Sequence, residues 1–150
     1  MKVKLICAIS SDGYIARHSN EKIQWSKDLS LFKKQTMNKT VIIGFNTHKT
    51  LVNKLDGRNL IIPTRTDKAN KLIKNISKTE SECFIAGGGN TNSKFANYLT
   101  DIYLTPHPIF LGSGIRLFST NTINAKTKLE NKIPVPGAEG IFQYHFKVLK

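Results

Sequence analysis

Short, continuously apolar runs recur along this chain, and they limit its possible folds more than any other feature. Five of them span four to seven residues and are separated by stretches with helical spacing: Val3–Ile9, Thr40–Gly44, Asn59–Ile62, Glu82–Ala86 and Ile102–Thr105. Runs that do not alternate with polar residues are typical of strands covered on both faces. Their alternation with helical stretches predicts βαβ units and a mostly parallel sheet flanked by helices.

The last third of the chain has a different pattern. Two segments, Ala125–Ile133 and Ile141–Leu149, flank a turn-forming stretch that begins Pro134-Val135-Pro136-Gly137, which predicts an antiparallel hairpin at the sheet edge. No repeat, low-complexity tract or linker divides the 150 residues. We therefore predict an α/β fold with three layers and a C-terminal antiparallel hairpin, in one domain over residues 1–150.

Composition excludes several classes of protein. Hydrophobic residues make up 39% of the chain, too many for a disordered one, and no apolar run approaches the roughly 20 residues of a membrane span. Cys7 and Cys83 lie in apolar segments without CxxC spacing, which predicts reduced core thiols and a cytoplasmic location. The four histidines are too dispersed to form a local ligand set, so we expect no structural metal.

The chain carries 23 basic and 10 acidic residues, a formal charge of +13. Such a charge is compatible with nucleic-acid binding. The lysines, however, are spread along the chain without interleaved aromatic residues for base stacking. Solvated surfaces are the plain interpretation, and attraction of small anionic ligands is a third one.

Asp28 joins a carboxylate to an apolar pattern. The spacing predicts a helix over Trp25–Met37 that Ser26 is able to cap, with Trp25, Asp28, Leu29 and Phe32 on one face. A buried acid needs hydrogen-bond donors or works with a shifted pKa. The alternative is an ordinary acid near a helix N-terminus, favoured by the helix dipole.

Three apolar runs end in groups that suit anions. Gly87-Gly88-Gly89-Asn90-Thr91 follows one run and opens a helical pattern, and Gly44-Phe45-Asn46-Thr47 follows another. Thr64-Arg65 follows a third. Glycines let backbone N–H groups approach a phosphate, and arginine binds one bidentately. Because ligands bind at the carboxyl ends of strands in open α/β sheets, we predict that these groups converge on one anionic dinucleotide.

Taken together, these segments resemble dihydrofolate reductase over Lys4 to about Thr105, in the order of that family. The most specific segment is Asp28-Leu29-Ser30-Leu31-Phe32-Lys33, which looks like the family's D-L-x-x-F-K helix. The other matching parts are Ile6-Cys7-Ala8-Ile9-Ser10, Met37 to Gly44, then Thr47, Leu51, Leu55, Gly57 and Arg58, and finally Ala86-Gly87-Gly88-Gly89 and Tyr103-Leu104-Thr105.

The resemblance implies that NADPH passes a hydride to the pterin ring of dihydrofolate, within folate and one-carbon metabolism. It assigns the active-site acid to Asp28, with Thr105 as its hydrogen-bond partner. It further implies that the substrate lies against Ile6, Cys7, Ala8, Asp28, Leu29, Phe32, Leu51, Leu55, Arg58 and Thr105, with Arg58 on the glutamate carboxylate.

For the cofactor, the resemblance implies contacts with Ala8, Ile15, Gly44, Thr47, Thr64, Arg65, Ala86, Gly87, Gly88, Gly89, Asn90 and Thr91. Two departures stand out. Phe45 occupies the position of an arginine, which leaves Arg65 to favour NADPH and predicts weaker selectivity. Trp25 lies three residues before Asp28 where the family has five, which predicts a shortened loop.

Other readings stay open. Ser11 to Ala16 and Pro108 to Phe118 resemble riboflavin-pathway reductases, whose substrate is a ribosylaminopyrimidine phosphate. A basic nucleic-acid-binding module without catalysis is the alternative from another class. His107, between two prolines, is interpreted as a turn residue. We expect a small-molecule substrate, no nucleic-acid or membrane partner, and a monomer or homodimer.

Overall fold

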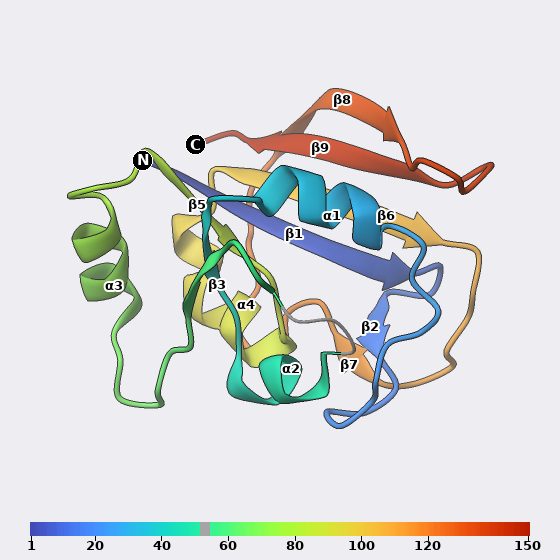
Figure 1. Ribbon diagram of the computed structural model, residues 1–150, viewed down its shortest axis with the longest axis horizontal. Coiled ribbons are helices and arrows are strands. Elements are labelled where there is room, and N and C mark those ends of the chain that lie inside the picture. Colours follow the sequence, from blue (N-terminus) through green and yellow to red (C-terminus); the bar gives the residue numbers. More distant parts are fainter. Residues whose placement is uncertain (52–54) are drawn as a thin grey trace.

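A seven-stranded mixed sheet forms the centre of the computed structural model, which describes residues 1–51 and 55–150 (Figure 1). The strand order is β4-β3-β5-β1-β6-β9-β8, and β2 and β7 form a separate two-stranded ribbon. The strands are β1 (Lys2–Ser10), β2 (Tyr14–Ala16), β3 (Thr40–Ile42), β4 (Asn59–Ile61), β5 (Glu82–Ile85), β6 (Asp101–His107), β7 (Ile115–Arg116), β8 (Thr127–Pro134) and β9 (Phe142–Val148). The helices are α1 (Leu29–Thr36), α2 (Phe45–Thr50), α3 (Ala69–Ile76), α4 (Gly89–Phe95) and the 3-10 turn η1 (Ala96–Tyr98).

The predicted fold class is confirmed. Strands β4, β3, β5, β1 and β6 pair in parallel, whereas β9 pairs antiparallel with both β6 and β8. The hairpin therefore lies at one edge of the sheet, as the Pro134–Gly137 turn predicted. Its outer strand β8 is almost wholly exposed and carries Lys128 and Lys132, a composition that discourages pairing of the free edge with another chain.

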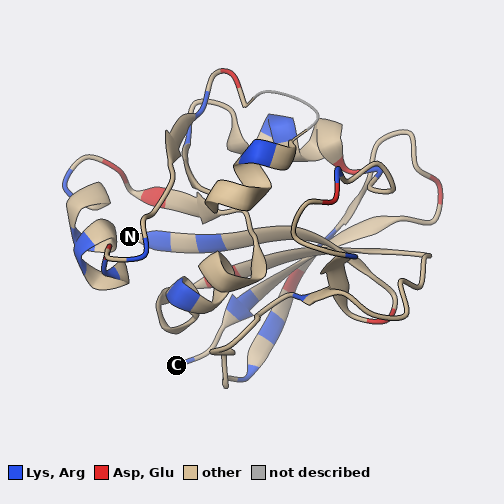
Figure 2. Cartoon of the chain, turned by 90° about the horizontal axis from the view of Figure 1, so that it is seen from below, with Lys and Arg blue, Asp and Glu red and all other residues tan. Residues whose placement is uncertain are grey.

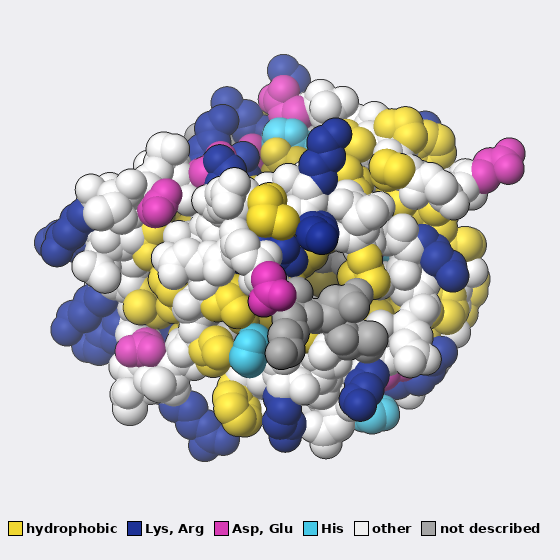
Figure 3. Space-filling view, in the orientation of Figure 1, with side chains coloured by type: hydrophobic (Ala, Val, Ile, Leu, Met, Phe, Trp, Pro, Cys, Tyr) yellow, Lys and Arg dark blue, Asp and Glu magenta, His cyan; other side chains and the backbone are white. Residues whose placement is uncertain are grey.

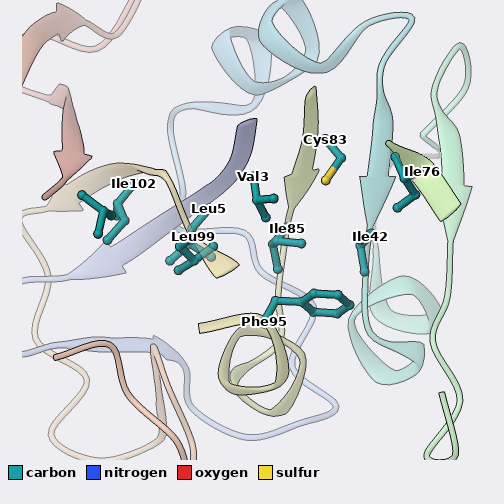
Figure 4. Packing of buried hydrophobic residues seen from close by; sticks show 10 residues of the cluster. Val3, Leu5, Ile42, Ile76, Cys83, Ile85, Phe95, Leu99 and Ile102 are labelled. Atoms are coloured by element: carbon teal, nitrogen blue, oxygen red, sulfur yellow. The ribbon is translucent and has the colours of Figure 1, made fainter. Parts of the chain in front are cut away.

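Both faces of the sheet are covered, which explains the continuous apolar runs. One face packs against α3 and α4, with Phe95 of α4 among the side chains of β1, β3 and β5 (Figure 4). The other face packs against α1 through a smaller cluster in which Phe32 contacts Ile6, Val41 and Phe84. Cys7 and Cys83 are free thiols. No helix within the described residues is long and apolar enough to span a membrane.

Two expectations about local structure are wrong. The helix predicted over Trp25–Met37 begins only at Leu29, because the Phe32 N–H donates to the Asp28 carbonyl to form its first turn. Ser26 therefore does not cap this helix. His107 is no turn residue: it is the last residue of β6 and is buried.

Candidate active site

Asp28 occupies the N-cap position of α1, yet its side chain makes no capping hydrogen bond. It is only 7% exposed. An acid at the N-cap usually accepts hydrogen bonds from the first N–H groups of the helix. The Asp28 carboxylate does not do so and remains free for another partner. Of the two interpretations of this residue, the structure supports the buried acid.

The polar neighbours of Asp28 come from β6. Burial raises the pKa of the Asp28 carboxyl above its ordinary 3.8, while the neighbouring His107 ring and the hydroxyl of Thr105 act in the opposite direction. Thr105 is fully buried, and its Oγ1 has no partner at full hydrogen-bond distance among the described residues. An acid of raised pKa beside an unsatisfied hydroxyl is a surrounding typical of a functional site.

Cys7 and Ala8 lie on β1, directly beside β6. Ala8 is in register with Thr105, which places the end of β1 next to the acid. Burial, reinforced by the charge of Asp28, raises the pKa of the Cys7 thiol to about 12. This thiol therefore stays protonated at neutral pH, and Cys7 contributes packing surface and no nucleophile.

The predicted convergence of glycine-rich strand ends is present between β3 and β5. The Gly44 N–H donates to the Gly87 carbonyl at 2.7 Å, and a Cβ on Gly44 would lie 2.7 Å from Thr91 Oγ1. Thr47 lies against Gly87 and Gly88, where a Cβ on Gly88 would be 3.0 Å from Thr47 Oγ1. Parallel pairing of β3 with β5 brings these segments, 43 residues apart in sequence, to one edge of the sheet.

Backbone N–H groups are available at the same place. The first helical bond of α4 runs from the Asn92 N–H to the Gly88 carbonyl, so the N–H groups of Gly89, Asn90 and Thr91 have no acceptor within the helix. Gly87 has a φ of +96°, a conformation that side chains disfavour. Ala86 leads into this turn and is half-buried against the cluster of Ile6, Val41 and Phe84.

Thr64 and Arg65 lie in the loop after β4, on the far side of β3. The Thr64 N–H donates to Asp67 at 2.8 Å, and Lys94 of α4 donates to the Thr64 carbonyl at 2.9 Å. Arg65 is exposed. The sequence pattern did not indicate Asp67, within this loop, or Lys94 of α4 as partners of Thr64, since neither follows a strand directly.

The residues expected around the substrate differ in exposure. Ile6 is buried and Phe32 half-buried, in the cluster beneath α1, whereas Leu29 is 47% exposed. Leu51 is the residue directly after α2, and Leu55 is buried. Residues 52–54 between them lie outside the described part of the chain. Figure 3 shows apolar side chains lining a hollow on the face that carries α1 and α2.

Arg58 is positioned just before β4. Its Nη1 donates to the Asp56 carbonyl at 2.7 Å, while its Nε is buried and lacks a partner among the described residues. A guanidinium with a free, dehydrated N–H fits a carboxylate ligand.

The ribbon of β2 and β7 brings together the two segments that resembled riboflavin-pathway reductases. Asp12 accepts hydrogen bonds from the N–H groups of Leu111, at 3.1 Å, and Gly112, at 2.8 Å. Tyr14 pairs with Arg116, and Ile15, expected near nicotinamide, is half-buried in β2. Two- and three-residue strands leave too little periodicity to be predicted.

These features define a class of protein: an α/β protein with a glycine-rich turn after two of its parallel strands and a buried acid at the start of an adjoining helix. Residues 2–108 match the family Dihydrofolate reductase. The dihydrofolate reductases of two Buchnera aphidicola subspecies are relatives. The protein of Buchnera aphidicola subsp. Schizaphis graminum is 33% identical over 130 residues (79% of each chain). That of Buchnera aphidicola subsp. Baizongia pistaciae is 29% identical over 117 residues (70% of each chain). This chain belongs to the dihydrofolate reductase family.

Solved structures show the same fold at low sequence identity. Dihydrofolate reductase from Enterococcus faecalis, complexed with NADP(H) and RAB-propyl, has a TM-score of 0.72 at 15% identity, covering 99% of this chain and 97% of that one. A putative riboflavin biosynthesis protein from Shewanella has a TM-score of 0.70 at 18% identity, covering both chains fully. A bifunctional deaminase and reductase from Thermotoga maritima has 0.77 at 13%, covering 99% of this chain and 56% of that one.

Proposed function

We propose that this chain reduces 7,8-dihydrofolate to tetrahydrofolate with NADPH. The observation that supports this most is the buried Asp28 carboxyl beside the unsatisfied Thr105 hydroxyl, in the same sheet whose strands β3 and β5 lead into the paired Gly44 and Gly87. An acid and a hydroxyl side by side match the amino group and ring nitrogen of a pterin, which offer adjacent hydrogen-bonding atoms.

The residues present fit NADPH. Gly87 to Thr91 would hold its pyrophosphate with backbone N–H groups, and Thr47 contacts the same turn. Ala8 and Ile15 would border the nicotinamide, and Thr64 with Arg65 would meet the adenosine phosphates. When bound, the nicotinamide supplies the hydride.

Asp28 holds and moves the proton in this proposal. Because burial raises its pKa, the carboxyl is better matched to proton donation near neutral pH than an exposed aspartate would be. Thr105 would share the pterin amino group with it. Leu29 and Phe32 would cover the ring and exclude water, and Arg58 would bind the glutamate carboxylate through its dehydrated N–H.

The proposal also covers the domain organisation and the class of partner. Residues 1–150 would act as one domain on a small-molecule substrate. The Lys and Arg residues, blue in Figure 2, are spread over strands and helices, which favours solvated surfaces over a nucleic-acid-binding stripe.

The test is the loss of NADPH absorbance with purified protein and dihydrofolate, against a control without substrate. We expect turnover with the natural chain, and Asp28→Asn should lose about 10²- to 10⁴-fold in kcat while keeping NADPH affinity. Equal activity in Asp28→Asn would remove Asp28 from the mechanism. Turnover only with a ribosylaminopyrimidine phosphate would replace the proposed substrate, and absence of NADPH binding would overturn the reductase proposal.

A further inference from the structure

His107 is buried at the end of β6, and the function proposed above gives it no task. It is 2% exposed, and both of its ring nitrogens are hydrogen-bonded. The Lys27 N–H donates to Nε2 at 2.9 Å, and Nδ1 lies 2.8 Å from the Thr105 carbonyl. A backbone amide can only donate, so Nε2 is the acceptor and Nδ1 carries the proton. The two bonds together require a neutral ring with one particular tautomer.

The two hydrogen bonds of the His107 ring go to the backbone of residues at the candidate site. Lys27 immediately precedes Asp28, and Thr105 is the residue whose hydroxyl faces the Asp28 carboxyl. The imidazole therefore joins the backbone on both sides of the candidate site. Trp25 adds a third contact, with its ring edge-on to the imidazole at 5.3 Å and 80°.

The segment that His107 contacts has little other regular structure. Residues 17–28, between β2 and α1, contain no helix or strand. By contrast, the backbone of His107 is anchored to the end of β1, because Ser11 Oγ donates to its carbonyl at 2.7 Å and the Ser11 N–H donates to the Ile109 carbonyl at 2.8 Å. The imidazole of His107, whose backbone is held in the sheet, therefore binds Lys27 near the end of an irregular loop.

We propose that His107 is a positioning residue that docks the end of the loop 17–28 onto β6 and thereby holds Asp28 at the substrate. This inference rests on the proposed function and assigns His107 no contact with the substrate. The decisive bond is the one from the Lys27 N–H to Nε2, because it is the one that restrains the residue next to Asp28. Loss of that bond frees the loop end, and a displacement of about 1 Å in a reacting group can lower a rate about 100-fold.

Three substitutions separate this role from simple packing. His107→Gln places an amide oxygen near the position of Nε2 and can still accept from Lys27. His107→Asn places its amide near Nδ1 and can still donate to the Thr105 carbonyl, but it does not reach Lys27. His107→Phe keeps the ring contact with Trp25 and removes both hydrogen bonds.

Activity gives the first readout. With dihydrofolate and NADPH we expect His107→Gln to stay within about threefold of the natural kcat, and His107→Asn and His107→Phe to lose about 10- to 100-fold with little change in KM for NADPH. A purely structural role would lower thermal stability in all three and leave kcat per folded molecule unchanged.

Trp25 gives a readout that needs no turnover. It is the only tryptophan in the chain, so tryptophan fluorescence, excited selectively over the tyrosines, reports on this loop alone. We expect easier acrylamide quenching in His107→Asn and His107→Phe than in the natural protein and His107→Gln. This comparison stands even if the natural protein does not reduce dihydrofolate, so the two proposals can fail separately. The inference is overturned if His107→Asn equals or exceeds His107→Gln in kcat and in protection of Trp25, or if His107→Phe changes neither.

Discussion

Asp28 is held where burial disfavours its charged form. Burial raises the pKa of its carboxyl, so the folded state keeps the proton at pH values where the unfolded chain has released it. Within that range the folded state binds more protons, and the free energy of unfolding falls as pH rises. The stabilising effect is complete below the unfolded value of about 3.8 and is lost as pH rises through the raised folded value.

This linkage predicts that Asp28→Asn stabilises the protein at neutral pH. The asparagine stays uncharged, so its unfolding free energy should lack the decline on the alkaline side of the Asp28 titration. Denaturant unfolding of both proteins from pH 4 to pH 8 checks this. The two curves should converge toward the acid end, and equal stability at pH 7 would contradict the prediction.

Thr105 offers a second test at the same scale. Its Oγ1 has no partner among the described residues, so removing it breaks no hydrogen bond at full distance in the folded protein. Thr105→Val, which keeps the shape, should leave the unfolding free energy within about 1 kcal/mol. It should raise KM for dihydrofolate about 2- to 10-fold, the equivalent of one hydrogen bond. Thr100→Val is the control, because its hydroxyl bonds to Val3 and Asp101 and should affect stability instead.

At the scale of elements, Glu82 joins three neighbouring strands. Its carboxylate lies 2.8 Å from Lys4 Nζ of β1 and 2.9 Å from Lys39 Nζ, directly before β3. Hydrogen bonds from both lysines hold the pKa of Glu82 below its ordinary 4.5. The interaction is therefore complete above that pH and weakens as pH falls through the lowered value.

We expect Glu82→Gln to lower the unfolding free energy by about 0.5–1 kcal/mol at pH 7, since partly exposed ion pairs contribute little each. The difference should shrink below pH 4. Glu80→Gln is the matched control, because Glu80 is exposed and makes no ion pair within the described residues. Chemical denaturation at pH 7 and pH 3 measures both, and an unchanged difference at pH 3 would exclude the ion pairs as its source.

At the scale of the whole molecule, the charge of +13 surrounds a site proposed for anionic ligands. A positive field raises the local concentration of anions, and salt screens it. Raising NaCl from 50 to 500 mM should therefore increase KM for NADPH by roughly tenfold at most and KM for NADH less, since NADH carries one phosphate fewer. Steady-state kinetics at both salt concentrations test this prediction. Identical salt effects on KM for NADPH and KM for NADH would argue against a charge effect.

The fold followed from the sequence because its determinants are local. Val3–Ile9 and Glu82–Ala86 are too continuously apolar for any position except the covered centre of a sheet, where β1 and β5 lie. Asp28, Gly44 and Gly87 could be selected as candidate site residues from the sequence for a similar reason. Each of them interrupts the apolar pattern of the residues next to it.

Long-range pairing decided the rest. Parallel register brings Thr105 beside Ala8 and the Gly44 segment to Gly87. The role of His107 was hidden, because an isolated histidine between prolines indicates nothing until β6 places it against Lys27, 80 residues away in sequence. The sequence by itself determined which segments become buried strands and which residues can carry charge or bind anions. Only the tertiary structure decided which of those groups meet, because hydrogen bonds between distant segments depend on strand register and loop path, and neither leaves a periodic trace in the chain.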